Sequence, residues 1–319
     1  MTLPEHIIIW GGGRWAKNYL NAVQDIETWG ANIHILTSNP EISKSFSKPI
    51  YHHDSSKTLP KSALISSLIV NHNNKHKDAI AYALKHKHNI LCEKPLMVEQ
   101  YQLSEAKELS NKSSLVFWES MLPCYCSYFK TIKIMSKDCE KIDLIWYDKP
   151  GEIKDSLKKR HDKNIRYIDD VMPHALSIAR ILFDKPQQLI NIEEYSTNED
   201  QGLFRLNYGN IIVSCQCSRV AKKRVRKLAG YKSQDQVFNL DFTEEPGKLI
   251  TAYGKSINET LDSQIQHSIM RSQSTNLRPI HMQIYDFFHQ NKKLYWPTRQ
   301  NYSIHEINSI PRKSLNSLW

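Results

Sequence analysis

The segment from Ile7 to Ala16 constrains the fold of this chain more than any other part of the sequence. It begins as a short apolar, β-branched run, which is typical of a buried parallel strand. Three consecutive glycines end the run, and apolar residues then recur at helical spacing. In this strand, turn and helix context, Gly11, Gly13 and Ala16 match G-x-G-x-x-G and predict a dinucleotide-binding loop. Gly13 lets the backbone approach a pyrophosphate, to which the helix N-terminus offers N–H donors.

The composition is that of a globular protein. The chain has 319 residues, 40% of them hydrophobic and 24% charged, which is enough for two domains with sizeable cores. There is no apolar run as long as a membrane span and no signal-peptide pattern, so we expect a cytoplasmic protein with no membrane partner. The six cysteines are then expected to be reduced thiols. Two C-x-C pairs are narrower than the C-x-x-C spacing of zinc sites, so we expect no metal.

The net charge of +10 points to an anionic partner. The densest basic run lies between Arg219 and Lys227, just after an apolar strand-like segment. We interpret it as a solvated strand or loop, because a run of charge alone specifies little. A nucleic-acid partner is not expected, because no zinc-finger, leucine-zipper or RNA-recognition signature accompanies the charge. An anionic small-molecule substrate is the alternative that we favour.

The first third of the chain alternates strand and helix signals, which predicts a parallel, doubly wound sheet. Strands are expected near 7–10, 32–36, 50–51, 63–70, 89–92 and 115–118, with helices after the glycines, over 75–86 and over 98–109. All strand C-termini then meet at one edge, where such folds bind ligands. The residues expected at this edge are Gly11 to Gly13, Thr37, Asn71 to Asn73 and Glu93 to Pro95.

The pattern changes near residue 120. Helices are expected over 124–136 and 167–183, with a strand over 142–146 between them and alternating segments at 189–195, 203–208, 210–217, 225–231 and 236–242. Successive strands with short turns predict a mostly antiparallel open sheet in an α+β domain. Further helices are expected over 280–289 and 302–310, and the last one can return to the first domain. We therefore predict a Rossmann domain over 1–120 and a second domain over 121–319.

Two sets of side chains can carry proton transfer. Lys94 follows a strand at the ligand edge, and a lysine there can donate or accept a proton if its surroundings lower its pKa. Asp170 and His174 are spaced i, i+4 on the helix over 167–183 and so share one face. A carboxylate and an imidazole on one face can orient a hydroxyl or carbonyl group and relay a proton. A surface turn for Lys94 and a core histidine for His174 are the structural alternatives.

These features resemble the family of nicotinamide-dependent oxidoreductases that includes glucose-fructose oxidoreductase, inositol dehydrogenase and MocA. The resemblance is strong to about residue 123 and looser after it. It rests on the stretch from Gly11 to Asn18, on His76, on Ala83-Leu84 leading into Leu91 to Leu96, and on Asp170 to His174.

The resemblance implies a Rossmann domain and a second domain whose open sheet covers the substrate and often forms the interface of a homo-oligomer. It makes Lys94 the catalytic lysine and places Asp170 and His174 at the family's D-x-G-x-H positions. Together with the predicted sheet edge, it gives as cofactor-binding candidates Gly11, Gly13, Arg14, Trp15, Thr37, Ser38, Asn71, His72, His76, Glu93 and Lys94. The chain departs from the family pattern at Met172, where glycine is usual, and at Ser177, where aspartate is usual.

The end of the second strand favours NADP(H) over NAD(H). An acidic residue there would bind the ribose 2′-hydroxyl of NAD, but the chain has Thr37-Ser38-Asn39 and no carboxylate before Glu41. Hydroxyl groups suit a 2′-phosphate, whose charge Lys44 or Arg14 could neutralise, whereas a carboxylate would repel it.

The function we expect is hydride transfer between nicotinamide and a hydroxyl or keto carbon of a sugar-like substrate, including one linked to a nucleotide. Lys94 would transfer the proton, with His174 and Asp170 assisting. Two alternatives stay open. One is an imine reductase of the thiazolinyl imine reductase type, which the departure at Met172 permits. The other is a regulator that binds the dinucleotide without catalysis.

Overall fold

The chain folds into two compact units. The first comprises Met1–Leu122 and Leu277–Ile307, and the second Pro123–Asn276 and Asn308–Trp319. The computed structural model describes residues 3–43, 46–62, 64–96, 101–102, 104–105, 108–109, 115–137, 139–151, 153–154, 157–158, 165–183, 189–244, 248–251, 279–289 and 312–314. The helix predicted over 302–310 and the side chain of Lys44 lie outside these residues.

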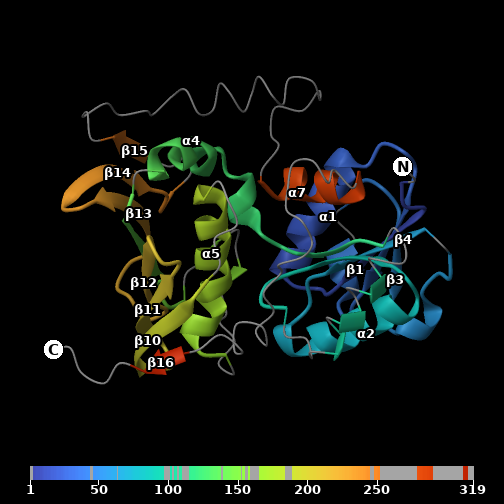
Figure 1. The fold of residues 1–319 in the computed structure, drawn as a ribbon. Helices are drawn as coiled ribbons and strands as arrows, with labels where there is room; N and C mark the ends of the chain where they lie inside the picture. The colour runs from blue at the N-terminus through green and yellow to red at the C-terminus, as the bar shows by residue number, and fades with distance from the viewer. Residues whose placement is uncertain are drawn as a thin grey trace. The chain divides into compact units, whose positions relative to one another are not determined.

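The first unit is built on a six-stranded parallel sheet (Figure 1). Its strands are β1 (His6–Trp10), β2 (Asn32–Leu36), β3 (Ile50–His53), β4 (Ile65–Ile69), β5 (Asn89–Cys92) and β6 (Phe117–Glu119), in the order β3-β2-β1-β4-β5-β6. Every neighbouring pair is parallel. The order reverses between β1 and β4, which is the switch point where doubly wound sheets bind ligands. The predicted parallel sheet is therefore confirmed.

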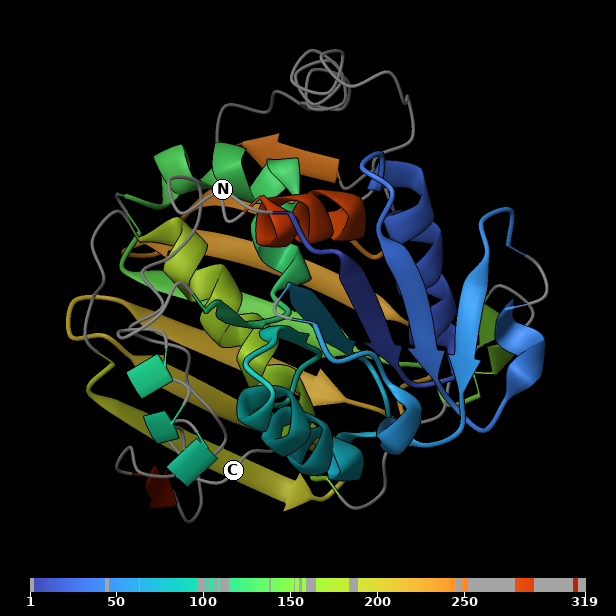
Figure 2. The same ribbon diagram turned by 90° about the vertical axis from the view of Figure 1, so that its right-hand side faces the viewer.

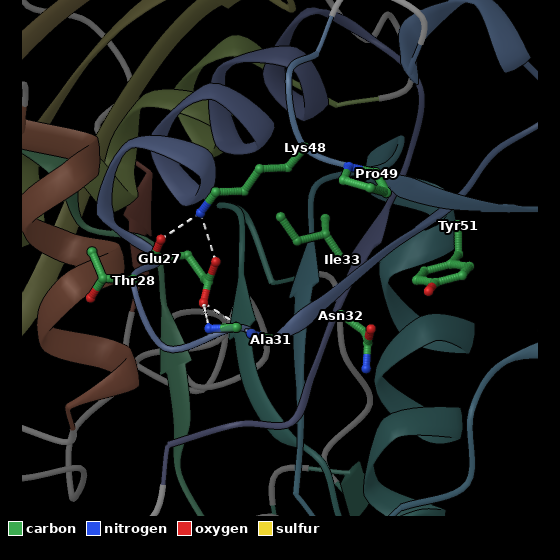
Figure 3. A pocket seen from close by; sticks show the side chains of 9 residues that line it. Glu27, Thr28, Ala31, Asn32, Ile33, Lys48, Pro49 and Tyr51 are labelled. Atoms are coloured by element: carbon green, nitrogen blue, oxygen red, sulfur yellow. Dashed lines mark hydrogen bonds and ion pairs between the residues drawn. The ribbon is translucent and has the colours of Figure 1, made fainter.

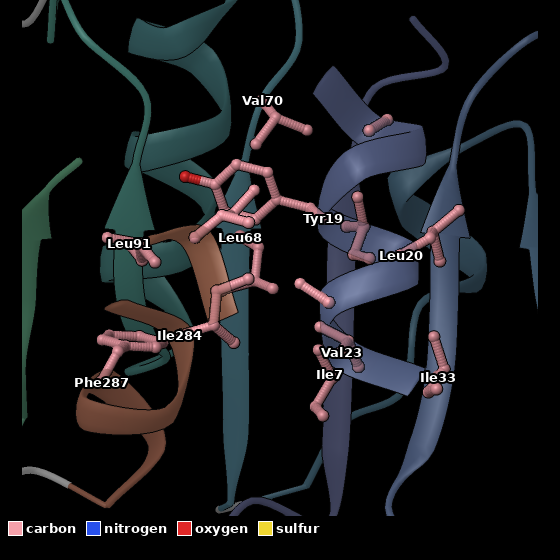
Figure 4. Close-up of a cluster of buried hydrophobic side chains, with 14 of the residues drawn as sticks. Ile7, Tyr19, Leu20, Val23, Ile33, Leu68, Val70, Leu91, Ile284 and Phe287 are labelled. Carbon is pink, nitrogen blue, oxygen red and sulfur yellow. The ribbon is translucent and has the colours of Figure 1, made fainter. Parts of the chain in front are cut away.

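Helices cover both faces of this sheet. The helices are α1 (Arg14–Ile26), α2 (His76–Lys85) and α7 (Pro279–Phe288), and short 3₁₀ turns lie at η1 (Pro40–Ser43), η2 (Ser56–Thr58), η3 (Asn73–Lys75) and η4 (Leu122–Tyr125). One buried cluster joins α1 and α7 to the strands, with Tyr19, Ile284 and Phe287 at its centre (Figure 4). A second cluster packs α2 against the other face, around Ile8, Ile80 and Leu84. α7 thus completes the core of a sheet whose last strand ends at Glu119, far earlier in the chain.

The second unit is a mixed sheet with helices packed on it (Figure 2). Its main sheet has the order β15-β14-β13-β7-β12-β11-β10-β16. The bounds are β7 (Lys141–Tyr147), β10 (Asn191–Asn198), β11 (Gln201–Asn207), β12 (Ile212–Ser218), β13 (Val225–Lys232), β14 (Asp235–Asp241), β15 (Lys248–Thr251) and β16 (Arg312–Ser314). A separate hairpin pairs β8 (Ile153–Lys154) with β9 (Leu157–Lys158). The helices are α4 (Ser127–Ser136) and α5 (Tyr167–Leu182).

Most of the neighbouring strands in this sheet are antiparallel, as predicted. The exceptions are β7 with β12 and β10 with β16, which are parallel. α5 packs against β11 and β12, and α4 packs against β14. Gly202 on β11 makes the approach of α5 possible, because a Cβ there would lie 2.5 Å from Ile168. In the described part of the chain, no helix is both long enough and apolar enough to cross a bilayer.

Candidate active site

The loops that follow the parallel strands gather at one edge of the first unit's sheet, as the sequence predicts. Gly11 follows β1, and its N–H donates to the carbonyl of Leu36 at 3.0 Å. Its φ of +133° is one that L side chains rarely adopt. A Cβ on Gly11 would lie 3.0 Å from the main chain of Asn71, which follows β4. The glycine turn is therefore packed tightly against the next loop along the edge.

Gly12 and Thr37 compete for one space. A Cβ on Gly12 would lie 1.9 Å from the Thr37 hydroxyl oxygen. That hydroxyl accepts a hydrogen bond from the main-chain N–H of Asn39 at 3.1 Å, which fixes the turn after β2. Ser38, between them, is exposed. Both hydroxyl-bearing residues of the predicted cofactor set thus follow β2 beside the glycine loop.

The start of α1 is open to a ligand. Gly13 is the N-cap residue, no side chain caps the helix, and its first turn has no acidic residue. A Cβ on Gly13 would meet no protein atom within 4 Å. Arg14 lies with its guanidinium carbon 5.9 Å from the ring of Trp15, whose side chain is 38% exposed. The N–H donors of the first turn and a nearby cation are therefore available to an anion.

His76 links two loops of the edge and is fully buried. Its Nδ1 lies 3.0 Å from the carbonyl oxygen of Pro95, and its Nε2 lies 3.1 Å from that of Asn71. Burial lowers the pKa of the imidazole, and the two carbonyl contacts oppose this shift. His72 is exposed, and its Nδ1 contacts the Asn74 side chain at 3.0 Å. His76 therefore holds the loops together from behind, while His72 faces solvent.

These features fit a dinucleotide. Among the described residues, the side-chain oxygen of Asn71 is buried without a hydrogen-bond partner, although it lies at the switch point. The uncapped start of α1 and the open space at Gly13 provide the donors and the room that a pyrophosphate needs. Gly11, Gly13 and the first turn of α1 would hold the pyrophosphate, and Asn71 would face the far half of the molecule.

Lys94 lies in a turn that is otherwise buried. From Leu91 to Leu96, only Lys94 is not buried. The carboxylate of Glu93 accepts hydrogen bonds from Tyr19 at 2.7 Å and from Ser120 at 2.9 Å. Burial raises the pKa of Glu93, while these donors and Lys94 partly offset the shift. The turn therefore presents one amine at the ligand edge and buries the neighbouring carboxylate.

Asp170 and His174 lie in the second unit, on α5, where both are partly exposed. The His174 ring stacks on Trp146 of β7, with centroids 4.4 Å apart and planes 17° from parallel. Burial raises the pKa of Cys217 to about 12, a main-chain hydrogen bond with Gly202 opposes this shift, and the negative charge of Asp170 adds to it. Asp170 therefore lies close to β12, and His174 is held against the central strand of the sheet.

A buried ion pair lies beside this stack. Arg226 of β13 pairs with Asp148, and the side chains of both are only 3% exposed. The guanidinium carbon is 4.1 Å from the centroid of the Trp146 ring. Tyr167 donates a hydrogen bond to the other oxygen of Asp148 at 2.5 Å. His174, Trp146 and Arg226 thus form one continuous stack of contacts that Asp148 anchors.

The basic run between Arg219 and Lys227 is not uniformly solvated, which corrects the interpretation made from sequence. Arg219 is 7% exposed and pairs with Asp200, and Arg226 is 3% exposed. Lys222, Lys223 and Lys227 are exposed. The alternation of β13 carries the missing signal, because Arg226 has the parity of Leu228 and shares its buried face.

The departures from the expected motif have local structural roles. Met172 is fully buried, so a larger side chain fills the space of the usual glycine. Ser177 is buried and donates to the main-chain oxygen of His174 at 2.8 Å. Sequence reasoning missed Tyr19, Ser120 and Trp146. The one available signal for Tyr19 was its hydroxyl group, which occupies a position of the first helix where the pattern calls for an apolar residue.

A shallow cavity of about 370 Å³ lies at the opposite edge of the first unit's sheet, before β2 and β3 (Figure 3). Lys48 and Glu27 form an ion pair of 2.7 Å across it. Glu27 also accepts hydrogen bonds from the N–H groups of Gly30 and Ala31. These charges are matched within the protein, so the cavity carries no part of the site. No group of three potential metal ligands lies together among the described residues.

The sequence of residues 6–120 matches the family described as an oxidoreductase family with an NAD-binding Rossmann fold. Residues 6–120 belong to this family. This match confirms the resemblance found in the sequence and the expectation of an NAD(P)-dependent oxidoreductase. The matched region contains the glycine loop, the start of α1 and the Lys94 turn. A comparison with curated protein sequences finds no match.

Solved structures of oxidoreductases share the fold along most of the chain. UDP-N-acetylglucosamine 3-dehydrogenase GnnA from Acidithiobacillus ferrooxidans has a TM-score of 0.69 at 12% identity, covering 91% of this chain and 90% of that chain. Myo-inositol 2-dehydrogenase from Lactobacillus plantarum has a TM-score of 0.64 at 15% identity, covering 95% and 93%. The dehydrogenase MviM from Clostridium difficile has a TM-score of 0.62 at 14% identity, covering 92% of each chain. At such identities, the likeness concerns the fold.

Proposed function

We propose that this oxidoreductase transfers a hydride between NADP(H) and a hydroxyl-bearing carbon of a nucleotide-linked sugar. The observation that carries the proposal is the turn from Leu91 to Leu96, which lies at the ligand edge and in which Lys94 is the only residue that is not buried. The family match to residues 6–120 and the fold shared with a UDP-N-acetylglucosamine dehydrogenase support it. The net charge of +10 suits a substrate that carries a diphosphate.

Lys94 would move the proton. In the oxidation direction its amine would accept the proton of the substrate hydroxyl, and in reduction its ammonium would return that proton to the carbonyl oxygen. A bound nicotinamide supplies the acceptor or donor of the hydride. On α5, His174 and Asp170 would orient the substrate hydroxyl groups, with Trp146 fixing the plane of the imidazole.

The preference for NADP(H) is supported by the turn after β2. Thr37 and Ser38 present hydroxyl groups there, and no carboxylate precedes Glu41. Arg14, at the start of α1, supplies a cation on the same side of the sheet edge. Three cofactor candidates remain. Trp15 would offer an exposed ring beside the glycine loop, and His72 a solvent-facing imidazole. His76 would act indirectly, by holding the Lys94 turn through the carbonyl of Pro95.

An imine substrate is the second candidate. The fully buried Met172, in place of a glycine, makes the base of α5 bulkier than the family pattern predicts. A more compact, less hydroxylated substrate would fit such a change.

We further propose that the enzyme is cytoplasmic, because all six cysteines are free thiols. We also propose that it forms a homo-oligomer, which light scattering would test.

The first experiment is a titration of tryptophan fluorescence with NADPH and with NADH. We expect tighter binding of NADPH, with Trp10 and Trp15 near the glycine loop reporting it. Gly13→Asp should abolish binding, because its carboxylate would repel the pyrophosphate. Preference for NADH would overturn the cofactor choice, and normal affinity in Gly13→Asp would overturn the assignment of the loop.

The catalytic assignment is tested with Lys94→Ala. We expect turnover of UDP-N-acetylglucosamine with NADP⁺ to fall by about 10²- to 10⁴-fold, because the variant lacks the proton-transfer group. Dinucleotide affinity should stay within about twofold, since the glycine loop is unchanged. Retained turnover would contradict the role of Lys94. Turnover of a cyclic imine, but of no sugar nucleotide, would favour the second candidate.

A further inference from the structure

The side chain of Glu93 points away from the ligand edge and into the core of the first unit. Its residue is 8% exposed, and the Tyr19 side chain that meets it is fully buried. Figure 4 shows the Tyr19 ring extending from α1 past Leu68 and Val70, with its hydroxyl directed toward β5. That hydroxyl lies 2.7 Å from Oε1 of Glu93. A polar contact therefore crosses an otherwise hydrophobic cluster.

Two further parts of the chain meet at the same point. Ser120, which follows β6, donates to Oε1 of Glu93 at 2.9 Å and lies 3.2 Å from the Tyr19 hydroxyl. Its Oγ is also 3.2 Å from the side-chain oxygen of Gln283 on α7. Ser120 and Gln283 are 4% and 1% exposed. The network thus ties α1, β6 and α7 to the residue before Lys94.

The carboxylate also acts on the Lys94 turn itself. The main-chain N–H of Lys94 and its ammonium charge both stabilise the ionised form of Glu93. The N–H of Glu93 donates to the carbonyl of Ile69 at 2.8 Å, which fixes the turn to β4. On the far side, His76 contacts the carbonyl of Pro95. The backbone on both sides of Lys94 is therefore held by hydrogen bonds, and Lys94 is the one residue from Leu91 to Leu96 that is not buried.

We propose that Tyr19 and Ser120 are positioning residues, which hold the Lys94 backbone in place through the carboxylate of Glu93. The inference rests on the proposed role of Lys94 in proton transfer. A hydrogen-bonded network in a buried place is costly unless all its members are satisfied. A phenylalanine at position 19 would fill the same space with the same apolar contacts. The hydroxyl contributes only the bond to Glu93 and the contact with Ser120.

The test compares Tyr19→Phe, Ser120→Ala and the double variant with a matched control, Tyr82→Phe. The control removes a tyrosine hydroxyl bond of 3.1 Å to the carbonyl of Ser56 on the other face of the sheet. The first readout is the hydrogen-exchange rate of the Lys94 amide, measured by mass spectrometry on the peptide 91–96. This readout needs no substrate. The second is kcat and KM for UDP-N-acetylglucosamine, with the dissociation constant of NADPH.

We expect the Lys94 amide to exchange about tenfold faster in Tyr19→Phe and in Ser120→Ala, and at the wild-type rate in Tyr82→Phe. Amides of β1 and β4 should keep their protection, which separates a local effect from global loosening. kcat should fall about tenfold, with KM and the NADPH dissociation constant within about twofold. The fall in kcat of the double variant should be smaller than the product of the two single falls, because both hydroxyls donate to the same oxygen of Glu93.

Wild-type exchange and kcat in Tyr19→Phe would overturn the inference, as would equal effects in Tyr82→Phe. A fall in protection throughout the sheet would assign the network to stability alone and would also overturn it. Failure of the proposed function gives a different result. If Lys94→Ala keeps full turnover, the proton-transfer role fails, while the amide exchange of Lys94 still shows whether the network holds the turn.

Discussion

Each unit buries a polar cluster behind a candidate catalytic side chain, and the two clusters balance charge differently. Behind Lys94, the carboxylate of Glu93 is met by the neutral hydroxyls of Tyr19 and Ser120. Behind His174, the guanidinium of Arg226 is met by the carboxylate of Asp148, with both groups almost fully buried. The first cluster has one charged group among neutral donors, and the second has a complete ion pair.

The difference governs what each cluster tolerates. A buried carboxylate with neutral partners can take up a proton, and burial already raises the pKa of Glu93. A buried guanidinium cannot lose its charge, so it depends on its partner. Neutralising Glu93 should therefore lower the free energy of unfolding only slightly. Removing Asp148 from the second cluster should leave the charge of Arg226 uncompensated.

The largest effect is expected for Asp148→Ala. Arg226 would stay charged and buried without its carboxylate partner, so we expect the free energy of unfolding to fall by about 3–5 kcal/mol. Equilibrium unfolding in urea, followed by circular dichroism, measures this loss. The double variant Asp148→Leu with Arg226→Met serves as the control and should recover most of the stability, because both charges are gone. A loss below about 1 kcal/mol would mean that solvent reaches the pair.

Acid should weaken the first unit next. Burial lowers the pKa of His34 to about 4, with a further contribution from His6 and His53, and it lowers that of His88 to about 4, with a contribution from His86. The unfolded chain then binds these protons first. Stability should be complete above about pH 6.5 and fall as the pH drops toward 4, by about 2 kcal/mol for each histidine after solvent screening.

Urea midpoints at pH 7.5, 6 and 5 measure this effect. The variant with His34→Gln and His88→Gln should show a flatter dependence, since neither group titrates. The same acid loss in that variant would assign the pH dependence to other groups.

Glu93→Gln should give the smallest effect. The amide keeps an oxygen that accepts from Tyr19 and Ser120, so the free energy of unfolding should change by about 1 kcal/mol or less at pH 7. The raised pKa fixes the sign of the pH dependence. The ionised carboxylate is the costly form, so wild type should gain stability relative to Glu93→Gln as the pH falls toward 4.5. Parallel urea titrations at pH 8 and 5.5 measure the difference, and the opposite slope would contradict it.

The sequence predicted those parts of the molecule that depend on local pattern. The glycine turn, the alternation of strands and helices and the edge that holds Gly11, Asn71 and Glu93 all follow from short-range signals. The antiparallel character of the second sheet follows from its closely spaced strands. These features depend on the periodicity of apolar residues and on the positions of glycines, and both can be read from a single sequence.

The sequence did not predict contacts between residues that lie far apart in the chain. The network around Glu93 joins residues from α1, the end of β6 and α7, and Gln283 lies 163 positions from Ser120. The sequence contains no motif that marks such a meeting, because each residue alone is an ordinary member of its helix or strand. Arg226 was missed because its neighbours are basic, so the composition of the run hid the alternation of β13.

The contact between Gly12 and Thr37 has a consequence for how related chains can diverge. The two residues share one space, since the Thr37 hydroxyl occupies the place of a Gly12 Cβ. A larger residue at position 12 therefore needs the Thr37 side chain to rotate away or to be replaced by a smaller one, and the pair should covary across homologous sequences. Position 37 follows the strand that reads the cofactor ribose in such folds. The glycine at position 12 therefore leaves position 37 free to vary with the cofactor, whereas any other residue at position 12 would restrict which side chains position 37 can offer to the ribose.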